Sequence, residues 1–560
     1  MQRADEDSAG RRARSVPPAG TTLSPFRYRL FVAVWASALV SHVGGQVQGV
    51  GASWLMTSLA GSAQLVALVA TATLMPVLLF SLPFGAMADI YDRRKVLIAA
   101  QLIMFSASSL LSLAAFMGMI TPTLLLLLTF VIGLGFALNS PAWQAAVREF
   151  VPNEELAGAI SLNILGFQVA RTAGPALGGL IFGAAGAETA FAVNTCSYLA
   201  LLIVILKWRR PPNGSRLPPE TVTAAMANGL RFVLHAEGVG RIVIRATLFG
   251  LCLASMLALL PMVARYVLGG GPLVFGTLLA FGGVGAMIGA SSATRLRERY
   301  PPETISRAGQ LLVAVALAIV AASRSVPLTC FGELLSGLGM VLAFNSFTVT
   351  MQLSVPRWIV GRAMSIYQMG TFGGLALGSW LWGAVAEVIS VPWALGVASV
   401  CLFLAILAGI RFPLVQPDPR LVEPGEKRMG RHLELSDEDA SAPVTVTLEY
   451  RIDEADREAF FELMRQRRQV ILRHGVLHWA LGQDADDPAI WVDRFGRASW
   501  TDFLRHRNRR TLEEEQNLEA VMKLHKGSEP PRLRYFIERE LAPQGSPLLP
   551  RMGASDPRWG

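Results

Sequence analysis

Apolar and polar residues follow one another along this chain in blocks. From residue 26 to residue 412, long apolar runs alternate with short polar segments, and a helix needs about 20 apolar residues to cross a bilayer. The runs begin near Leu30, Leu65, Val96, Leu124, Ala159, Ala187, Arg241, Leu273, Ala308, Leu328, Ala363 and Pro392. Backbone amides in hydrocarbon must find partners within their own segment. We therefore predict an all-α membrane protein with twelve transmembrane helices.

The connecting segments predict the orientation of these helices. Alternate loops carry several Lys and Arg residues, as in Asp92-Arg93-Arg94-Lys95, whereas the loops between them, such as Thr57 to Gln64, are almost bare. Arg265 and Arg324 are the exceptions on the low-charge side. Because basic loops stay on the cytoplasmic side, we expect both termini to be cytoplasmic and the protein to lie in the inner membrane. The net charge of +9 has the same explanation, so we expect no nucleic-acid partner.

An internal repeat divides the apolar region into two related halves. At an offset of 204 residues, the separation of Gly85 and Gly289, many small residues coincide. The coincidences include Gly133 with Gly337, Val151-Pro152 with Val355-Pro356, Ser161 with Ser365, Gly166 with Gly370, and Gly174 with Gly378. Both copies have basic loops on the same side, which indicates two parallel six-helix repeats related by an axis along the membrane normal.

The chain changes character after residue 412. A polar segment rich in proline is followed by patterns typical of strands at Val444–Tyr450, Val476–Leu481, Ile490–Phe495 and Leu533–Ile537, with helical periodicity at Glu454–Arg473 and Trp500–Leu524. The order β-α-β-β-α-β predicts a small α+β ferredoxin-like C-terminal domain. The expected organisation is a cytoplasmic tail (1–25), a first six-helix half (26–206), a cytoplasmic central loop (207–240), a second six-helix half (241–412), a linker (413–442), the soluble domain (443–540) and a tail (541–560).

The segment Gly85-Ala-Met-Ala-Asp89-Ile-Tyr-Asp92-Arg93-Arg94-Lys95 places a glycine, an acid four residues later and a basic cluster between the second and third helices. It resembles the loop signature of the major facilitator superfamily, and its Asp92-Arg93-Arg94 ending resembles the transmembrane secretion effector branch, which includes the enterobactin exporter. The resemblance implies that these residues lock or release a cytoplasmic gate between the halves. The second copy departs from the pattern, with Ala293 at the position of Asp89.

Small residues recur every four positions in the fifth predicted helix, at Gly166, Ala170, Gly174 and Gly178. They share one face and allow a neighbouring helix to approach closely. Gly174-Pro175-Ala-Leu-Gly178-Gly179 also resembles the fifth-helix signature of antiporters of the superfamily, although Ala170 replaces its first glycine. By that resemblance Gly174, Pro175 and Gly178 form a hinge or seal that favours export; close packing alone is the other explanation.

Arg171 lies inside the fifth predicted helix, where a charge costs on the order of 3 kcal/mol on insertion scales and usually faces a cavity or a partner. Its repeat position, Leu375, is apolar, so we predict a substrate or gating contact, with a snorkelling or paired arginine as the alternative. Glu333 and His42 are candidates to carry a coupling proton; a helix-end carboxylate and a satisfied buried histidine are the alternatives. Further candidate substrate contacts are Gln46, Asn163 and Gln168.

These features predict a secondary active transporter, coupled to protons by resemblance, that exports small amphipathic molecules of the drug or siderophore class by alternating access. The alternative is a transporter body regulated by, or fused to, a ligand-sensing or cofactor-independent monooxygenase-like C-terminal domain. We favour a structural or dimerising role for that domain, and no enzyme activity. The chain has no phosphate loop, and its four cysteines lie widely spaced in apolar runs. We therefore expect no ATP-driven transport, cofactor, disulfide or metal site.

Overall fold

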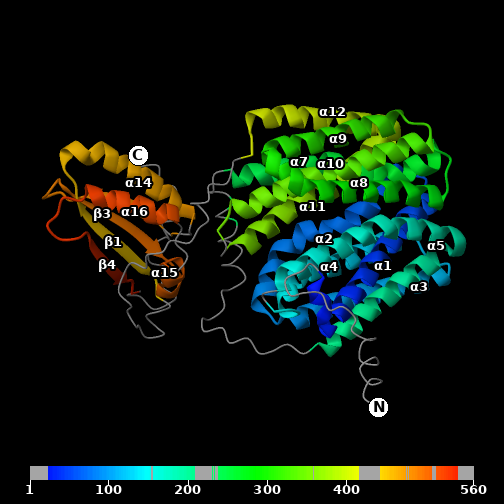
Figure 1. Ribbon diagram of the computed structural model, residues 1–560, viewed down its shortest axis with the longest axis horizontal. Helices are drawn as coiled ribbons and strands as arrows, with labels where there is room; N and C mark the ends of the chain where they lie inside the picture. Colours follow the sequence, from blue (N-terminus) through cyan, green and yellow to red (C-terminus); the bar gives the residue numbers. More distant parts are fainter. Residues whose placement is uncertain are drawn as a thin grey trace, which may run out of the picture. The chain divides into compact units, whose positions relative to one another are not determined.

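The computed structural model describes residues 23–152, 155–208, 230, 233, 238–356, 359–414, 442–473, 476, 478–507 and 512–539. The predicted tails, central loop and linker lie largely outside these residues, as does the side chain of Asp89. The chain forms two compact units, residues 1–417 and 418–560. Figure 1 shows the first as helices coloured blue to yellow and the second as a sheet with helices on one face.

The first unit is a bundle of long apolar helices. Within the described residues, eleven are long and apolar enough to cross a membrane. They are α1 (Arg29–Leu59), α2 (Ala63–Ile90), α3 (Arg93–Phe116), α4 (Pro122–Ala146), α5 (Leu156–Lys207), α7 (Val239–Met262), α8 (Pro272–Arg299), α9 (Pro302–Ala322), α10 (Val326–Leu353), α11 (Val360–Ile389) and α12 (Val391–Arg411). Short turns at Ser24–Arg27, Val147–Glu149 and Val263–Val267 adjoin them.

The long helix α5 contains two spans rather than one. It has 52 residues, and Gly186 inside it adopts a non-helical backbone with φ 79° and ψ −179°. At the corresponding position of the repeat, Ser390 separates α11 from α12 with φ 87° and ψ 155°. Ser390 is the single non-glycine residue with positive φ in the described part of the chain, and such a conformation costs an L-residue on the order of 1–3 kcal/mol. The break confirms twelve spans, and its recurrence confirms the repeat.

The two halves pack alike. In the first half, α1 packs on α5, α2 packs on α4, and α3 packs on both α4 and α5. The second half repeats this pattern: α7 packs on α11, α8 packs on α10, and α9 packs on both α10 and α12. The halves meet mainly where α2 packs on α11 and α5 on α8, as the blue-to-cyan and green-to-yellow groups in Figure 1 show. Because consecutive spans reverse direction, one end of the bundle carries the basic loops and the other carries the low-charge loops; we name these ends the basic face and the low-charge face.

The start of α9 differs most from its predicted position. The helix begins at Pro302, whereas the apolar run begins near Ala308, because two charged residues occupy its first turns. Glu303 forms an ion pair with Arg245 of α7 at 2.6 Å and another with Arg307, and it accepts a hydrogen bond from the backbone N of Leu414 at 2.9 Å. This ionic cluster lies where α7, α9 and the end of α12 meet.

The second unit is a four-stranded antiparallel sheet with helices on one face. Its strands are β1 (Val444–Arg451), β2 (Trp479–Gln483), β3 (Ile490–Arg497) and β4 (Arg532–Ile537), in the order β2-β3-β1-β4. Its helices are α14 (Arg457–Arg473), α15 (Trp500–Arg507) and α16 (Leu512–Leu524). The ferredoxin-like prediction is confirmed, with two differences: β2 begins at Trp479, and the helical stretch after Trp500 is in two pieces.

The core of the second unit includes an ion pair. Alternate residues of β1 and β3, such as Tyr450 and Phe495, pack with Phe460 of α14. Among them the guanidinium of Arg467 lies 2.7 Å from the carboxylate of Asp493, and these side chains are 8% and 0% exposed. Burial opposes the charged guanidinium, but the adjacent Asp493 holds the pKa of Arg467 above its usual value. This pair fastens α14 to the centre of the sheet.

Candidate functional site

The basic cluster after α2 ties together three helix ends of the first half. The Asp92 carboxylate accepts a hydrogen bond from the backbone N of Arg94 at 2.9 Å and so caps α3. Arg93 forms an ion pair with Glu149, beyond the end of α4, at 2.8 Å. Arg94 donates to the backbone O of Leu206 at 2.7 Å, near the end of α5. The described contacts of both arginines thus lie within their own half.

Gly85, in contrast, lies at the contact between the halves. A Cβ atom at this position would lie 2.7 Å from Oγ of Ser365, on α11. Ser81, one turn earlier on α2, faces the same residue, because its hydroxyl lies 3.5 Å from the backbone O of Ser365. The glycine therefore permits the close approach of α2 to α11 near the basic face.

The glycine face of the fifth span packs against α1. A Cβ atom at Gly174 would lie 2.6 Å from Cβ of Gln46, and one at Gly178 would lie 3.0 Å from Cα of Val47. In the second half the equivalent face of α11 packs on α7, where a Cβ atom at Gly374 would lie 2.2 Å from the backbone O of Thr247. The small residues therefore serve close helix packing in both halves.

Pro175 points in another direction. Its backbone O lies 2.7 Å from the position that a Cβ atom would take at Gly276 of α8, and a Cβ atom at Gly179 would lie 2.7 Å from the backbone O of Pro272. The segment predicted to form a hinge or seal thus contacts α1 through Gly174 and Gly178 and the opposite half through Pro175. Its role in export remains a prediction.

Arg171 lies in the same contact between the halves, nearer the middle of the bundle. Its Nη2 donates to the thioether sulfur of Met340, on α10, at 2.9 Å, and its backbone O lies 3.0 Å from the Cβ position of Gly283, on α8. A thioether is a weak acceptor, and no acidic side chain among the described residues pairs with this guanidinium. Arg171 is therefore a cation between the two halves that has only a weak partner.

Glu333 lies on the other side of the same stretch of α8. Its side chain is 5% exposed, and Oε1 is buried with no hydrogen-bond partner in the described part of the chain. Its Oε2 lies 3.0 Å from the Cβ position of Gly282. Glu333 precedes Met340 by seven residues, which places both on one face of α10. The adjacent glycines Gly282 and Gly283 thus separate Glu333 from Arg171, at the place where α5, α8 and α10 meet.

The other predicted site residues lie on α1 and on the first span of α5. The ring of His42 meets Phe167 edge-on, with centroids 5.3 Å apart. No atom lies within 4 Å of the Cβ positions of Gly45 and Gly49, which share a face of α1 with His42. Within the described residues, no hydrogen bond is formed by the four side chains of His42, Gln46, Asn163 and Gln168. These polar groups remain available to a ligand.

Other polar side chains of the first half form hydrogen bonds with one another. The sequence alone does not distinguish them from the side chains without hydrogen bonds. Gln48 Oε1 accepts hydrogen bonds from Ser108, at 3.0 Å, and from Asn194. Gln101 donates to Asn139 at 3.1 Å. These contacts join α1, α3, α4 and the second span of α5. They hold the first half together, as polar groups commonly do between membrane helices, and the sequence gives no signal for which amides are paired.

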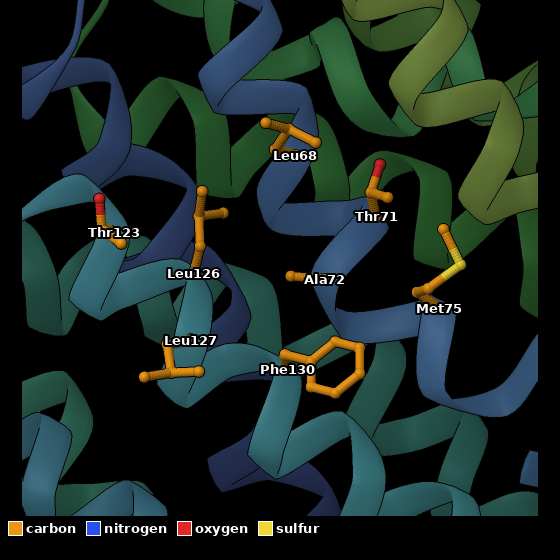
Figure 2. A pocket seen from close by; sticks show the side chains of 8 residues that line it. All are labelled: Leu68, Thr71, Ala72, Met75, Thr123, Leu126, Leu127 and Phe130. Carbon is orange, nitrogen blue, oxygen red and sulfur yellow. The ribbon is translucent and has the colours of Figure 1, made fainter. Parts of the chain in front are cut away.

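A groove elsewhere on the bundle has a different lining. It lies between α2 and α4 (Figure 2). Its volume is about 330 Å³. Its lining is Leu68, Thr71, Ala72, Met75, Thr123, Leu126, Leu127 and Phe130. The lining includes none of the predicted site residues, and Leu127 is 58% exposed on a membrane-spanning helix. We therefore place the candidate site between the halves and not in this groove.

Two parallel six-helix repeats with polar side chains between them define a multi-pass membrane protein. The transmembrane secretion effector family matches residues 20–542, and the chain belongs to this family of the major facilitator superfamily. The match includes the C-terminal domain.

Curated relatives are transporters at low identity. The chain is 23% identical to macrolide efflux protein A of Streptococcus pyogenes over 43% of this chain and 60% of that protein, so it spans less than two thirds of that relative. It is 23% identical to the staphyloferrin A transporter of Staphylococcus aureus, over 66% of this chain and 93% of that protein. It is 24% identical to the multidrug efflux pump Tap of Mycolicibacterium fortuitum, over 66% of this chain and 90% of that protein.

Solved structures show the same fold. An inward-facing, unoccupied bacterial homologue of the human lysosomal transporter Spinster aligns with a TM-score of 0.55 and 15% identity, over 68% of this chain and 97% of that one. A D-xylose–proton symporter aligns with a TM-score of 0.55 and 16% identity, over 70% of this chain and 99% of that one. These likenesses confirm the major facilitator fold of the first unit.

Proposed function

We propose that this protein is a secondary active exporter of small amphipathic molecules, of the drug or siderophore class, which works by alternating access in the inner membrane with both termini in the cytoplasm. The observation that carries the proposal is Arg171, a cation between the two halves with a thioether as its described side-chain partner. The relatives named above, which include macrolide, multidrug and siderophore transporters, support the direction and the substrate class.

The substrate binds between the halves, beside the open space at Gly45 and Gly49. The side chains on this side are a histidine, amides and the aromatic ring of Phe167, with one arginine. Such a lining suits a bulky molecule with an apolar body and a few polar groups. The guanidinium fork of Arg171 recognises a planar acidic or oxygen-rich group, and the weak bond to Met340 is readily exchanged for that contact.

Glu333 carries the coupling proton. It is buried, it has an oxygen with no bonded partner, and it lies beside the same α8 glycines as Arg171. When the halves rock, this carboxyl group moves between a dry and a hydrated environment, which is what exchange of one proton per cycle requires. Asp92, Arg93 and Arg94 control the basic face by holding or releasing the ends of α3, α4 and α5 during this motion, and Gly85 and Asp89 belong to the same gate at the end of α2.

An export comparison tests this function. A strain that lacks the protein is complemented with wild type, Arg171→Leu or Glu333→Gln, and intracellular retention of a panel of macrolides, dyes and siderophores is measured. We expect wild type to lower retention of at least one compound, and collapse of the proton gradient to abolish that effect. Both substitutions should raise retention at equal membrane levels, whereas Arg324→Ala, a control arginine bonded to Ser323 of its own half, should not. Wild-type export by both variants would refute the assigned site.

The C-terminal domain has a role of its own in this proposal, either to sense a ligand or to dimerise. One observation favours ligand sensing: Oδ1 of Asp493 and Nε1 of Trp500 are buried in this domain without a bonded partner in the described part of the chain. Deletion of residues 444–560 separates the roles. Unchanged export by the shortened protein would exclude regulation by this domain, and altered export would support it.

A further inference from the structure

Two charged side chains of the second half reach across to the corner between α1 and α2 on the low-charge face. Arg265 belongs to the π-helical turn Val263–Val267 at the end of α7. Its Nη1 donates to Thr57 Oγ1 at 3.0 Å and to Ser58 Oγ at 2.8 Å. Glu387, near the end of α11, accepts hydrogen bonds from Ser62 Oγ at 3.1 Å and from the backbone N of Gln64 at 3.3 Å.

The signs of the two charges match the helix ends that they contact. Arg265 contacts the last turn of α1, whose free carbonyls carry partial negative charge, and Glu387 contacts the first turn of α2, whose free amides carry partial positive charge. The guanidinium of Arg265 also lies 5.9 Å from the ring centroid of Trp54, on α1, which adds a cation–π attraction. Each contact is therefore electrostatically favourable.

The repeat does not require either charge. The positions in the first half that correspond to Arg265 and Glu387 are Gly61 and Gly183. Positive charge is also disfavoured in loops of this side, and Arg265 is one of its few basic residues. A specific interaction between the halves explains both side chains.

Arg265 lies beside an apolar cluster that joins the halves. Val50 and Trp54 of α1 pack there with Leu260 and Ala264 at the end of α7 and with Phe275 of α8, and Cys330 of α10 belongs to the same cluster. The rings of Trp54 and Phe275 are stacked with centroids 6.0 Å apart. Separation of the halves on this face would break the polar contacts and expose the cluster.

We propose that Arg265 and Glu387 form an interhalf latch that holds the low-charge face closed and must release when a substrate leaves there. The role of the latch in export rests on the proposed function, but its effect on the conformation of the bundle does not. Arg265 is the stronger member because it is half-buried, makes two side-chain bonds and faces Trp54, whereas Glu387 is exposed.

Labelling of Cys330 measures the latch without any substrate. This thiol is 5% exposed and lies in the second turn of α10, and replacing Cys196, Cys252 and Cys401 by alanine leaves it as the single cysteine. The protein is reconstituted in lipid nanodiscs and treated with a water-soluble maleimide. Since the labelling rate follows the population of the open state, we expect Arg265→Ala to raise it about five-fold and Glu387→Ala about two-fold.

Two further variants serve as controls. Arg265→Lys should stay within about two-fold of the parent, because one nitrogen of the arginine makes both hydrogen bonds and an ammonium can replace it. Arg324 lies on the same face but bonds within its own half. Arg324→Ala should therefore leave the labelling rate unchanged. No rise with Arg265→Ala, or an equal rise with Arg324→Ala, would overturn the latch. An export defect of the Arg171 variant is a separate outcome, since labelling requires no transport.

Discussion

The two halves of the bundle share a backbone but place their buried polar groups differently. In the first half Gln48, Ser108 and Asn194 form a hydrogen-bonded group inside the bundle. The corresponding residues of the second half, Cys252, Leu312 and Ala398, cannot form it.

The second half has an ionic cluster of its own. Arg245, Glu303 and Arg307 meet near the basic face, where the first half has Ser41, Ala99 and Ile103. The shared features, such as glycine packing and the break at Gly186 and Ser390, follow from helix geometry, whereas each half has its own polar interactions. The halves also differ at Arg171 and Leu375, and we propose that this difference serves transport.

The ionic cluster of the second half provides the largest expected effect on stability. Glu303→Gln removes the acid between two arginines, of which Arg245 is 9% exposed. Loss of one partner of a buried ion pair costs about 3–5 kcal/mol, so the melting temperature in detergent should fall markedly. Glu298→Gln, at an exposed carboxylate near the end of α8, should change stability by less than about 0.5 kcal/mol. Equal melting temperatures for the two variants would show that the cluster is not structural.

Glycine packing should matter equally in both halves. At Gly174 a new Cβ atom would lie 2.6 Å from Cβ of Gln46, and at Gly374 2.2 Å from the backbone O of Thr247. Overpacking of this kind costs typically about 1–3 kcal/mol, so each alanine variant should melt earlier than wild type. Gly45→Ala is the matched control, because open space surrounds that position; it should be neutral or slightly stabilising. A harmless Gly174→Ala would contradict the close α1–α5 contact.

The amide group of the first half should contribute less. Asn194→Ala removes a donor to Gln48, and hydrogen bonds between membrane helices contribute on average about 0.6 kcal/mol and at most about 1.7 kcal/mol. The reciprocal change, Ala398→Asn, adds an amide where Cys252 and Leu312 offer no comparable partner, and it should not stabilise the protein. Thermal unfolding of both variants measures the difference. A stabilising Ala398→Asn would mean that the halves are less distinct than their contacts indicate.

Effects of a similarly small size are expected at the paired backbone breaks. Ser390 adopts positive φ without being glycine, so Ser390→Gly should stabilise the protein, and Gly186→Ser should destabilise it, each by about 1 kcal/mol. Changes of opposite sign in melting temperature would support a shared backbone conformation. Changes of the same sign would argue against it.

Much of the fold could be predicted because local pattern determines it. Span length follows from apolar composition, and the repeat from small residues at a fixed offset. The start of α9 was placed too late, because Glu303 and Arg307 are indistinguishable from loop charges until their partners are known. Strand and helix periodicity predicts the ferredoxin-like order correctly, but it does not predict that β2 begins at Trp479.

The candidate site was predicted only in part. Arg171 was recognisable because a lone charge in an apolar run is costly, and its position between the halves agrees with that reasoning. The pairing of Gln48 with Asn194, and the contacts of Arg265 and Glu387 with the corner between α1 and α2, join residues far apart in the chain. No spacing in the sequence encodes such partners, because they depend on which helices pack together.

The efflux rate of Arg171 variants at equal membrane levels tests the central claim most directly. With the substrate found by the export comparison, we expect Arg171→Leu, which copies the second half at this position, to lower the rate at least about 100-fold, the equivalent of about 2.7 kcal/mol. Arg171→Lys should retain part of the rate, because it keeps the charge but lacks the planar fork. Arg324→Ala, the control arginine that bonds to Ser323 of its own half, should remain close to wild type. A folded, fully active Arg171→Leu would show that this charge takes no part in transport, and the site between the halves would then be wrong.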